Sequence, residues 1–183
     1  MSNKDKKTKS KIFIIVILIM SGLLMTACSK SEDRNKEAIK KVLEHQFTGP
    51  DEKFMELMQN PKYRTVVKNK EENKEFDQYV AEIYGPYFTD PGLQAFIAVF
   101  AAQYQTFAYN AGYTLRFKGV TAEQNENNPN LYTFSARVGY QKSGEEEKTA
   151  NIEGRAYFSA KEEGKIGKFE YVNDEGLSDK LRE

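Results

Sequence analysis

Tyr132-Thr-Phe-Ser-Ala-Arg-Val-Gly-Tyr140 is the stretch that decides the fold, because large or apolar residues alternate with small or polar ones along its whole length. Successive side chains of a β-strand point to opposite faces, so this period of two predicts a half-buried strand. The same period occurs in residues 113–118, 152–158 and 165–172, with turn residues between the segments. The pattern therefore predicts four antiparallel strands joined by short turns.

Before Gly112 the apolar period is that of a helix instead. One stripe consists of Ile39, Val42, Leu43, Gln46 and Phe47, in which Gln46 is the single polar lapse, and Gly49-Pro50 ends it. A second helix is predicted from the N-cap Asp51 to Asn60-Pro61, and a third around residues 76–83. Residues 62–74 show too weak a pattern to be assigned.

The longest helical pattern runs from residue 90 to Gly112, and we predict one continuous helix there. Asp90 is its expected N-cap, Pro91 takes the first helical position, and Gly112 follows its end. Phe100 on this helix and Phe134 on the second strand are expected to share one core. Helices followed by strands predict an α+β domain, with N-terminal helices packed on a curved four-stranded antiparallel meander.

The first 27 residues have the order of a cleaved secretory signal. Five lysines precede an almost pure hydrocarbon run from Ile12 to Met20, and small residues lead to Cys28, the only cysteine. An uncleaved membrane anchor is the alternative. Residues 12–27 are shorter, however, than the about 20 apolar residues that span a bilayer.

The end of this segment, Leu24-Met25-Thr26-Ala27-Cys28, resembles the lipobox of bacterial lipoproteins, with Met25 where leucine is usual. The resemblance implies cleavage after Ala27 and a diacylglycerol and palmitate anchor on Cys28, on the extracytoplasmic face of the cell membrane. Residues 28–35 are then a lipidated tether, residues 36–173 a single domain and residues 174–183 a polar, peripheral tail.

Charge and residue usage narrow the possible functions. Residues 1–27 hold five lysines and one aspartate, so their removal turns 27 basic and 27 acidic residues into a net charge of −4. A net acidic surface without a basic stripe argues against nucleic acid as a partner. His45 is the only histidine and is expected at the helix flank or surface. We therefore expect no metal site, no cofactor and no catalytic residues of ordinary type.

Two further groups of residues invite a functional interpretation. Glu145-Glu146-Glu147 lies at a predicted hairpin tip and lacks the spaced ligands of a calcium loop, so a solvated turn is the better interpretation. The mature chain is rich in tyrosine, whose hydroxyl needs a partner when buried. An ordinary core is one explanation. The other is an amphipathic cleft between helices and sheet, lined by Tyr104, Tyr113, Tyr132 and Tyr157.

The order of helices and strands resembles the cone-shaped nuclear transport factor 2-like fold, within the cystatin-like group, and small Gram-positive lipoproteins that carry such a domain. We expect a non-catalytic module that binds a protein partner or a small apolar ligand at the membrane surface. The alternative that the resemblance implies is an isomerase-like enzyme, in which a pocket carboxylate acts as base beside a tyrosine. Glu170 and Asp77 are the candidate carboxylates.

Overall fold

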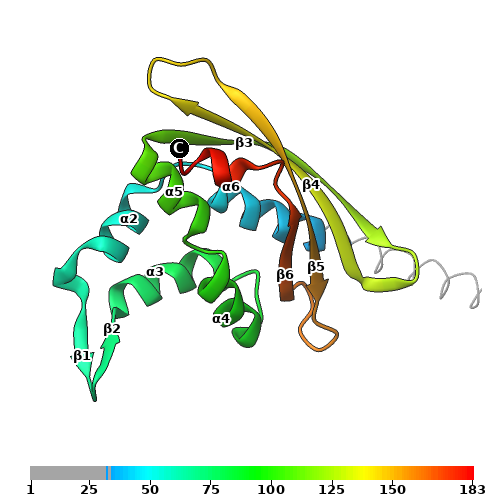
Figure 1. Ribbon diagram of the computed structural model, residues 1–183. Helices are drawn as coiled ribbons and strands as arrows, with labels where there is room; N and C mark the ends of the chain where they lie inside the picture. Colours follow the sequence, from blue (N-terminus) through cyan, green and yellow to red (C-terminus); the bar gives the residue numbers. More distant parts are fainter. Residues whose placement is uncertain (1–31, 33) are drawn as a thin grey trace, which may run out of the picture. The chain divides into compact units, whose positions relative to one another are not determined.

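The computed structural model describes Glu32 and residues 34–183, so the predicted signal segment and Cys28 lie outside the described residues. Residues Asn35–Glu183 form one compact unit by their internal contacts, and this unit is the domain described below. Its elements are helices on one side and a twisted sheet of long strands on the other (Figure 1).

The sheet confirms the predicted antiparallel meander. It consists of β3 (Tyr113–Asn125), β4 (Asn128–Lys142), β5 (Lys148–Phe158) and β6 (Ile166–Asn173), hydrogen-bonded in the order β3-β4-β5-β6. All three pairings are antiparallel. The α+β class predicted from the sequence is therefore correct.

β3 is about twice as long as its alternating segment suggested. Its register with β4 shifts between Phe117 and Gly119, and Gly119 has a φ of 145°, which glycine adopts far more readily than other residues. Such a bulge moves the following residues to the opposite face and increases the local twist. The alternation that predicted the strand is interrupted there, although the pairing with β4 continues to Asn125.

The first helices follow the predicted stripes closely. Residues 34–46 are helical, so the predicted tether reached too far: residues 34 and 35 already belong to the helix. The stripe predicted on this helix is completely buried. α2 (Glu52–Gln59) starts at the predicted cap, where the Asp51 side chain accepts the N–H of Phe54. α3 (Lys74–Tyr84) is the third predicted helix.

The prediction of one continuous helix over residues 90–111 is wrong, because the structure has two helices there, α4 (Asp90–Val99) and α5 (Gln103–Ala111). The cap of α4 is Thr89, one residue before the predicted Asp90, and its hydroxyl accepts the N–H of Gly92. A tertiary contact lies at the break. Gln46 Nε2 donates to the Ala101 carbonyl at 2.9 Å, a carbonyl that in a continuous helix would accept the N–H four residues later.

Gln105 makes the reciprocal contact and joins the two helices. Its Nε2 has two hydrogens to donate and lies within hydrogen-bond distance of the carbonyls of His45 and Gln46, each at 3.0 Å, and of Thr48 at 3.3 Å. These carbonyls lie at the end of the helix formed by residues 34–46, where no intrahelical donor is available. Two buried glutamines thus fix how this helix meets α5.

Helices and sheet share one aromatic core. Phe96 of α4 meets Phe169 of β6 with ring centroids 5.6 Å apart, and Phe134 of β4 stacks on Phe169 at 5.0 Å. Phe134 is buried as predicted. Phe100 is only half-buried, because it lies at the break between α4 and α5, although it still packs edge-on against Tyr171.

Two segments outside this arrangement were not foreseen. Residues 62–74 contain the end of a 3-10 turn (Pro61–Tyr63) and a hairpin of β1 (Thr65–Val67) and β2 (Lys70–Glu72). The tail predicted to be peripheral contains α6 (Leu177–Lys180), and Leu177 and Leu181 are completely buried. The prediction failed because polar residues surround the two leucines in sequence, while their own side chains reach the core.

Candidate functional site

The four tyrosines predicted to line a ligand cleft lie at different places in the described domain. Tyr132 on β4 is completely buried, and Tyr104 on α5 nearly so. Tyr113 is half-buried at the start of β3. Tyr157 is half-buried on the outer face of β5, the face on which Asn151, Glu153 and Arg155 are exposed. The structure does not bring these four side chains together around one cavity of the described residues.

Hydrogen-bonded polar groups fill the interior where the cleft was predicted. Gln46 Nε2 donates to the Tyr84 hydroxyl at 3.2 Å, and the Tyr171 hydroxyl donates to Gln46 Oε1 at 3.4 Å. Burial raises the pKa of Tyr84 and of Tyr171 well above the usual value, so both hydroxyls stay protonated. The polar lapse in the first helical stripe is therefore the centre of a satisfied buried network.

One tyrosine and one carboxylate face each other at the edge of this interior. The Tyr104 hydroxyl donates to Asp174 Oδ2 at 3.1 Å, and Ser178 N–H donates to the same oxygen at 2.9 Å. Desolvation raises the pKa of Asp174, but hydrogen bonds from Ser178, Tyr104 and Gly176 outweigh it and hold the pKa below its usual value. A carboxylate stabilised in this way is a weak base, which is the opposite of what proton abstraction needs.

The carboxylates named for an isomerase-like site lie elsewhere. Asp77 is exposed in the first turn of α3. Glu170 forms an ion pair with Lys168 on β6. A second tyrosine–carboxylate contact, from the Tyr79 hydroxyl to Asp51 Oδ2 at 2.7 Å, involves the N-cap of α2. Desolvation and this hydrogen bond raise the pKa of Tyr79 to about 12.

His45 and the glutamate run are the two remaining groups that the sequence analysis considered. His45 is exposed, its ring lies edge-on to Tyr84 at 5.9 Å, and partial desolvation lowers the pKa of the imidazole. Glu145 and Glu146 are exposed, while Glu147 pairs with Arg116 at 2.9 Å and also with Lys118. In the described part of the chain, no group of three or more potential metal ligands comes together.

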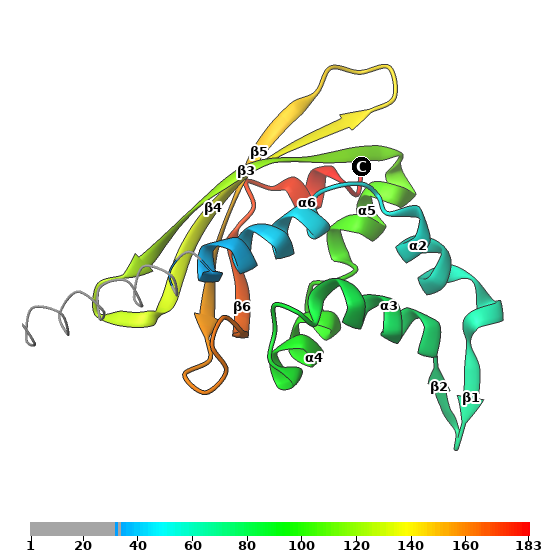
Figure 2. The ribbon, with the colours of Figure 1, turned by 180° about the vertical axis from the view of Figure 1, so that it is seen from behind.

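The β1–β2 hairpin is the most distinctive surface feature. It projects from the helical side of the domain in both views (Figures 1 and 2). Val66 is 75% exposed and Val67 39% exposed, which makes them two of the five large apolar side chains exposed in the described residues. Lys68 and Asn69 form the turn with φ of 49° and 62°, the signs that a type I′ turn requires.

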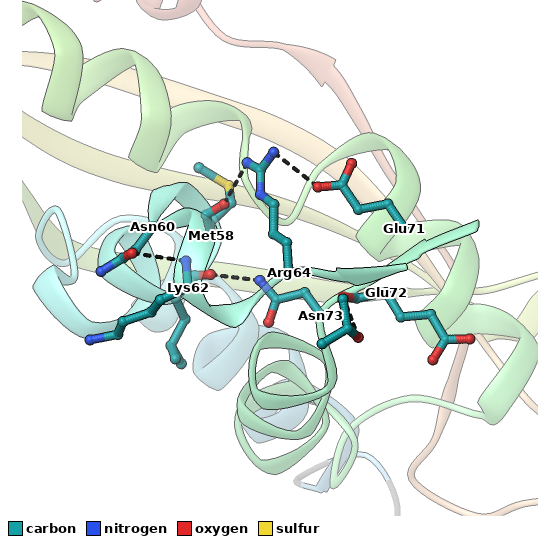
Figure 3. Close-up of polar contacts among 9 residues, drawn as sticks. Met58, Asn60, Lys62, Arg64, Glu71, Glu72 and Asn73 are labelled. Carbon is teal, nitrogen blue, oxygen red and sulfur yellow. Dashed lines mark hydrogen bonds and ion pairs between the residues drawn. The ribbon is translucent and has the colours of Figure 1, made fainter. Parts of the chain in front are cut away.

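Polar contacts fix the base of the hairpin to α2 and α3 (Figure 3). Arg64 Nη2 donates to the Met58 carbonyl at 3.1 Å, and Nη1 donates to Glu71 Oε1 at 3.2 Å. Asn73 Nδ2 donates to the Leu57 carbonyl at 2.7 Å, while its Oδ1 caps α3. These contacts join both ends of the hairpin to the ends of neighbouring helices, so its direction is set by the body of the domain.

A shallow hollow lies beside these contacts. It has a volume of about 230 Å³, and its lining combines the apolar side chains of Met58 and Phe76 with polar groups of Arg64, Glu71 and Glu72. The hairpin therefore offers two exposed valines on β1 beside the polar Lys68-Asn69 turn, and a mixed apolar and charged hollow at its base. This combination suits contact with another protein, because interface centres are apolar and their rims polar.

Sequence reasoning missed this site for a simple reason. Each strand has three residues, too few for an alternation to be recognised, and the β1 side chains are all exposed. The available signal was the pair Lys68-Asn69 between Val66-Val67 and Lys70, since asparagine tolerates the positive φ of a tight turn.

No protein-family model matches the chain, and no curated protein matches its sequence. Among the described residues, no helix has the length and apolar character needed to cross a membrane.

Proposed function

We propose that this protein is a lipid-anchored, non-catalytic binding module on the extracytoplasmic face of a cell membrane, and that the β1–β2 hairpin contacts a protein partner. The anchor is the lipobox-like Cys28, and the domain resembles the nuclear transport factor 2-like fold in its order of helices and meander. The observation that carries the proposal is the projecting hairpin with its exposed Val66 and Val67.

Stability alone gives no reason for such a hairpin. A two-stranded hairpin is marginally stable in water, and exposed valines gain nothing from the hydrophobic effect until another surface covers them. Single exposed apolar residues are common, but here an exposed valine lies on each face of a projecting strand, and the base of this arm is held by Arg64 and Asn73. A directed arm with exposed valines favours a partner that covers them.

The isomerase-like alternative has one supporting observation, the hydrogen bond between Tyr104 and Asp174. The lowered pKa of Asp174 and its role in holding Ser178 N–H favour a structural contact. If Asp174 were the catalytic base, the wild-type protein would show isomerase activity and Asp174→Asn would abolish it. We expect instead that the Asn variant differs from the wild type only in stability.

Photocrosslinking in the bacterium that encodes the protein tests the hairpin directly. A photoreactive phenylalanine analogue in place of Val66 should form a discrete protein adduct, because the tip lies against the partner. The matched control carries the same analogue at Val172, which is 58% exposed on β6, a strand that lies away from the hairpin in both ribbon views (Figures 1 and 2).

The comparison between the two positions decides the outcome. An adduct at position 66, without an equivalent adduct at position 172, supports the hairpin as the contact. Equal adducts at both positions would contradict it, since they would reflect crowding at the membrane.

The lipid anchor has a separate test. Mass spectrometry of the mature protein should show a chain that begins at Cys28 and carries the added mass of diacylglycerol, and Cys28→Ala should remove that modification. An unmodified N-terminus upstream of Cys28 would contradict the lipoprotein assignment and leave the hairpin experiment unaffected.

A further inference from the structure

The sheet has two edges, and the chain itself covers part of each. At the β6 edge, the Ile166 N–H donates to the Tyr87 carbonyl at 2.8 Å, and the Ile166 carbonyl accepts the N–H of Thr89 at 3.0 Å. At the β3 edge, the N–H and the carbonyl of Leu115 both bond to Gly49, at 2.6 and 3.1 Å. An uncovered edge is a template for a further strand, so proteins usually cover or interrupt it.

Residues 119–125 of the β3 edge are left uncovered. No backbone hydrogen bond joins them to a described element other than β4. Their pairing with β4 runs without a register shift from Gly119 to Gln124, and the segment contains no proline, no lysine and one charged residue, Glu123. Both ribbon views show β3 and β4 extending beyond the helices towards their turn (Figures 1 and 2). This part of the edge therefore lacks the usual protection against strand pairing.

The bulge in β3 decides which backbone groups are free. Every second residue of an antiparallel edge strand turns its N–H and carbonyl away from the neighbouring strand. Leu115 does so before the bulge, where both groups bond to Gly49. The extra residue of the bulge shifts the alternation by one, so the outward residues after it are Val120, Ala122 and Gln124. Each of them presents one donor and one acceptor at the free edge.

The side chains along this edge suit contact with another strand. Val120 and Ala122 pack against the core on the inner face of the sheet but are only half-buried. Thr121 and Glu123 are exposed on the outer face. A strand added here extends both faces, because it covers the first pair further and places side chains beside the second pair.

The order of these residues is self-complementary. A two-fold axis at Ala122 places Val120 of one copy opposite Gln124 of a second copy. All three outward residues of each copy are then paired, by about six backbone hydrogen bonds. The same register places the Thr121 hydroxyl opposite the Glu123 carboxylate of the second copy, so a donor faces an acceptor on the outer face.

The neighbouring two-fold registers are less favourable. An axis at Glu123 places two carboxylates directly opposite each other, which is destabilising. An axis at Thr121 places Gln124 opposite Lys118, which lies in the bulge and is already paired with Glu147. Only the register centred on Ala122 uses the whole free edge without a like-charge pair.

We propose that residues 119–125 of β3 form the interface between two copies of this chain, paired antiparallel about Ala122 so that the sheet continues from one copy into the other. Such an interface is isologous, so pairing covers the free edge of both copies and assembly stops at the dimer. The interface is independent of the β1–β2 hairpin and goes beyond the proposed protein contact.

Disulfide crosslinking of the purified protein in phospholipid vesicles tests the register, with the parent chain as background. Ala122→Cys should form a covalent dimer at least about tenfold faster than Gln124→Cys, because facing residues lie about 5.5 Å apart and a disulfide needs Cα atoms within about 7 Å. Gln124→Cys is the matched control, since it lies on the same edge but does not face its own copy. A mixture of Val120→Cys and Gln124→Cys should also crosslink, although neither does alone.

Two substitutions on the outer face test the same register without moving the thiol. In the Ala122→Cys chain, Thr121→Glu places carboxylates opposite each other and should slow dimer formation severalfold. Adding Glu123→Thr to that variant restores a hydroxyl opposite a carboxylate and should recover the rate. Circular dichroism checks that each variant unfolds cooperatively.

Three results would overturn the proposal. Equal rates for Ala122→Cys and Gln124→Cys would mean that the dimers arise from random collision. A rate that Thr121→Glu leaves unchanged would mean that the copies meet in another way. No dimer above background from folded variants, in the mixture of Val120→Cys and Gln124→Cys as well, would leave this edge to a strand from a different protein.

Discussion

The β1–β2 hairpin and residues 174–183, here named the closing segment, each contain a pair of apolar side chains, but the hairpin exposes its pair and the closing segment buries its pair. The hairpin pairs its backbone in a two-stranded ladder and leaves Val66 and Val67 exposed. The closing segment keeps its backbone bonds local and buries Leu177 and Leu181 completely. Backbone hydrogen bonding and side-chain burial are separate requirements, and a short segment can satisfy one without the other.

The difference predicts how each region contributes to the stability of the domain. A fully buried leucine is worth about 1.5–3 kcal/mol relative to an exposed one, whereas an exposed valine contributes almost nothing. The closing segment should therefore matter for the free energy of unfolding and the hairpin for contact with other molecules. Substitutions in both regions test this division.

The largest effect is expected at the closing segment. Leu177→Ala should lower the free energy of unfolding by about 2–5 kcal/mol, because it removes a buried side chain and leaves a cavity. Chemical denaturation followed by circular dichroism measures the change. A loss below about 1 kcal/mol would place Leu177 outside the core and remove the contrast with the hairpin.

A smaller effect is expected where the hairpin joins α3. Asn73→Ala removes both the N-cap of α3 and the hydrogen bond to the Leu57 carbonyl, so we expect a loss of about 1 kcal/mol. Asn73→Ser retains a capping oxygen and should recover most of it. If serine and alanine were equally destabilising, the contact with α2 would matter more than the cap.

The attachment of the closing segment should depend on pH. The pKa of Asp174 lies below its ordinary value of 3.8 in the folded state, because hydrogen bonds from Ser178, Tyr104 and Gly176 outweigh desolvation. The ionised carboxylate therefore stabilises the fold above pH 3.8, and this contribution is lost as the pH falls below 3.8 through the folded pKa. Unfolding measured across this range should show the loss in the wild type, while Asp174→Asn should lack it.

The smallest effect is expected at the hairpin tip. Val66→Ala should change the free energy of unfolding by no more than about 0.5 kcal/mol, as is usual for exposed positions. Thermal unfolding of Val66→Ala and Leu177→Ala under the same conditions compares the two losses of stability directly. A loss of several kcal/mol would mean that Val66 is covered in solution, and the hairpin would then resemble the closing segment.

Much of the architecture was predictable because it depends on local periodicity. The alternation of residues 132–140, the stripe that starts at Ile39 and the cap at Asp51 all have their expected structures. Each of these features is repeated or is specified by the chemistry of one residue. The α+β class follows from their order along the chain.

The candidate site was less predictable, because its residues depend on what surrounds them. Tyrosine content alone could not distinguish a lined cleft from a filled interior, and Tyr132 and Tyr104 are buried where a cleft was one interpretation. The hairpin strands were too short to produce a pattern, so the residues that project most from the helical side carried the weakest signal.

The sequence by itself determined the α+β order, the four-stranded meander and the N-cap of α2, since these follow from hydrophobic period and local hydrogen bonding. Only the tertiary structure revealed the break between α4 and α5, where the Gln46 amide reaches the Ala101 carbonyl from 55 residues away. It also decided that Leu177 and Leu181 are covered and Val66 is not. Burial is a property of the whole packed chain, and no local pattern specifies which neighbour will supply it.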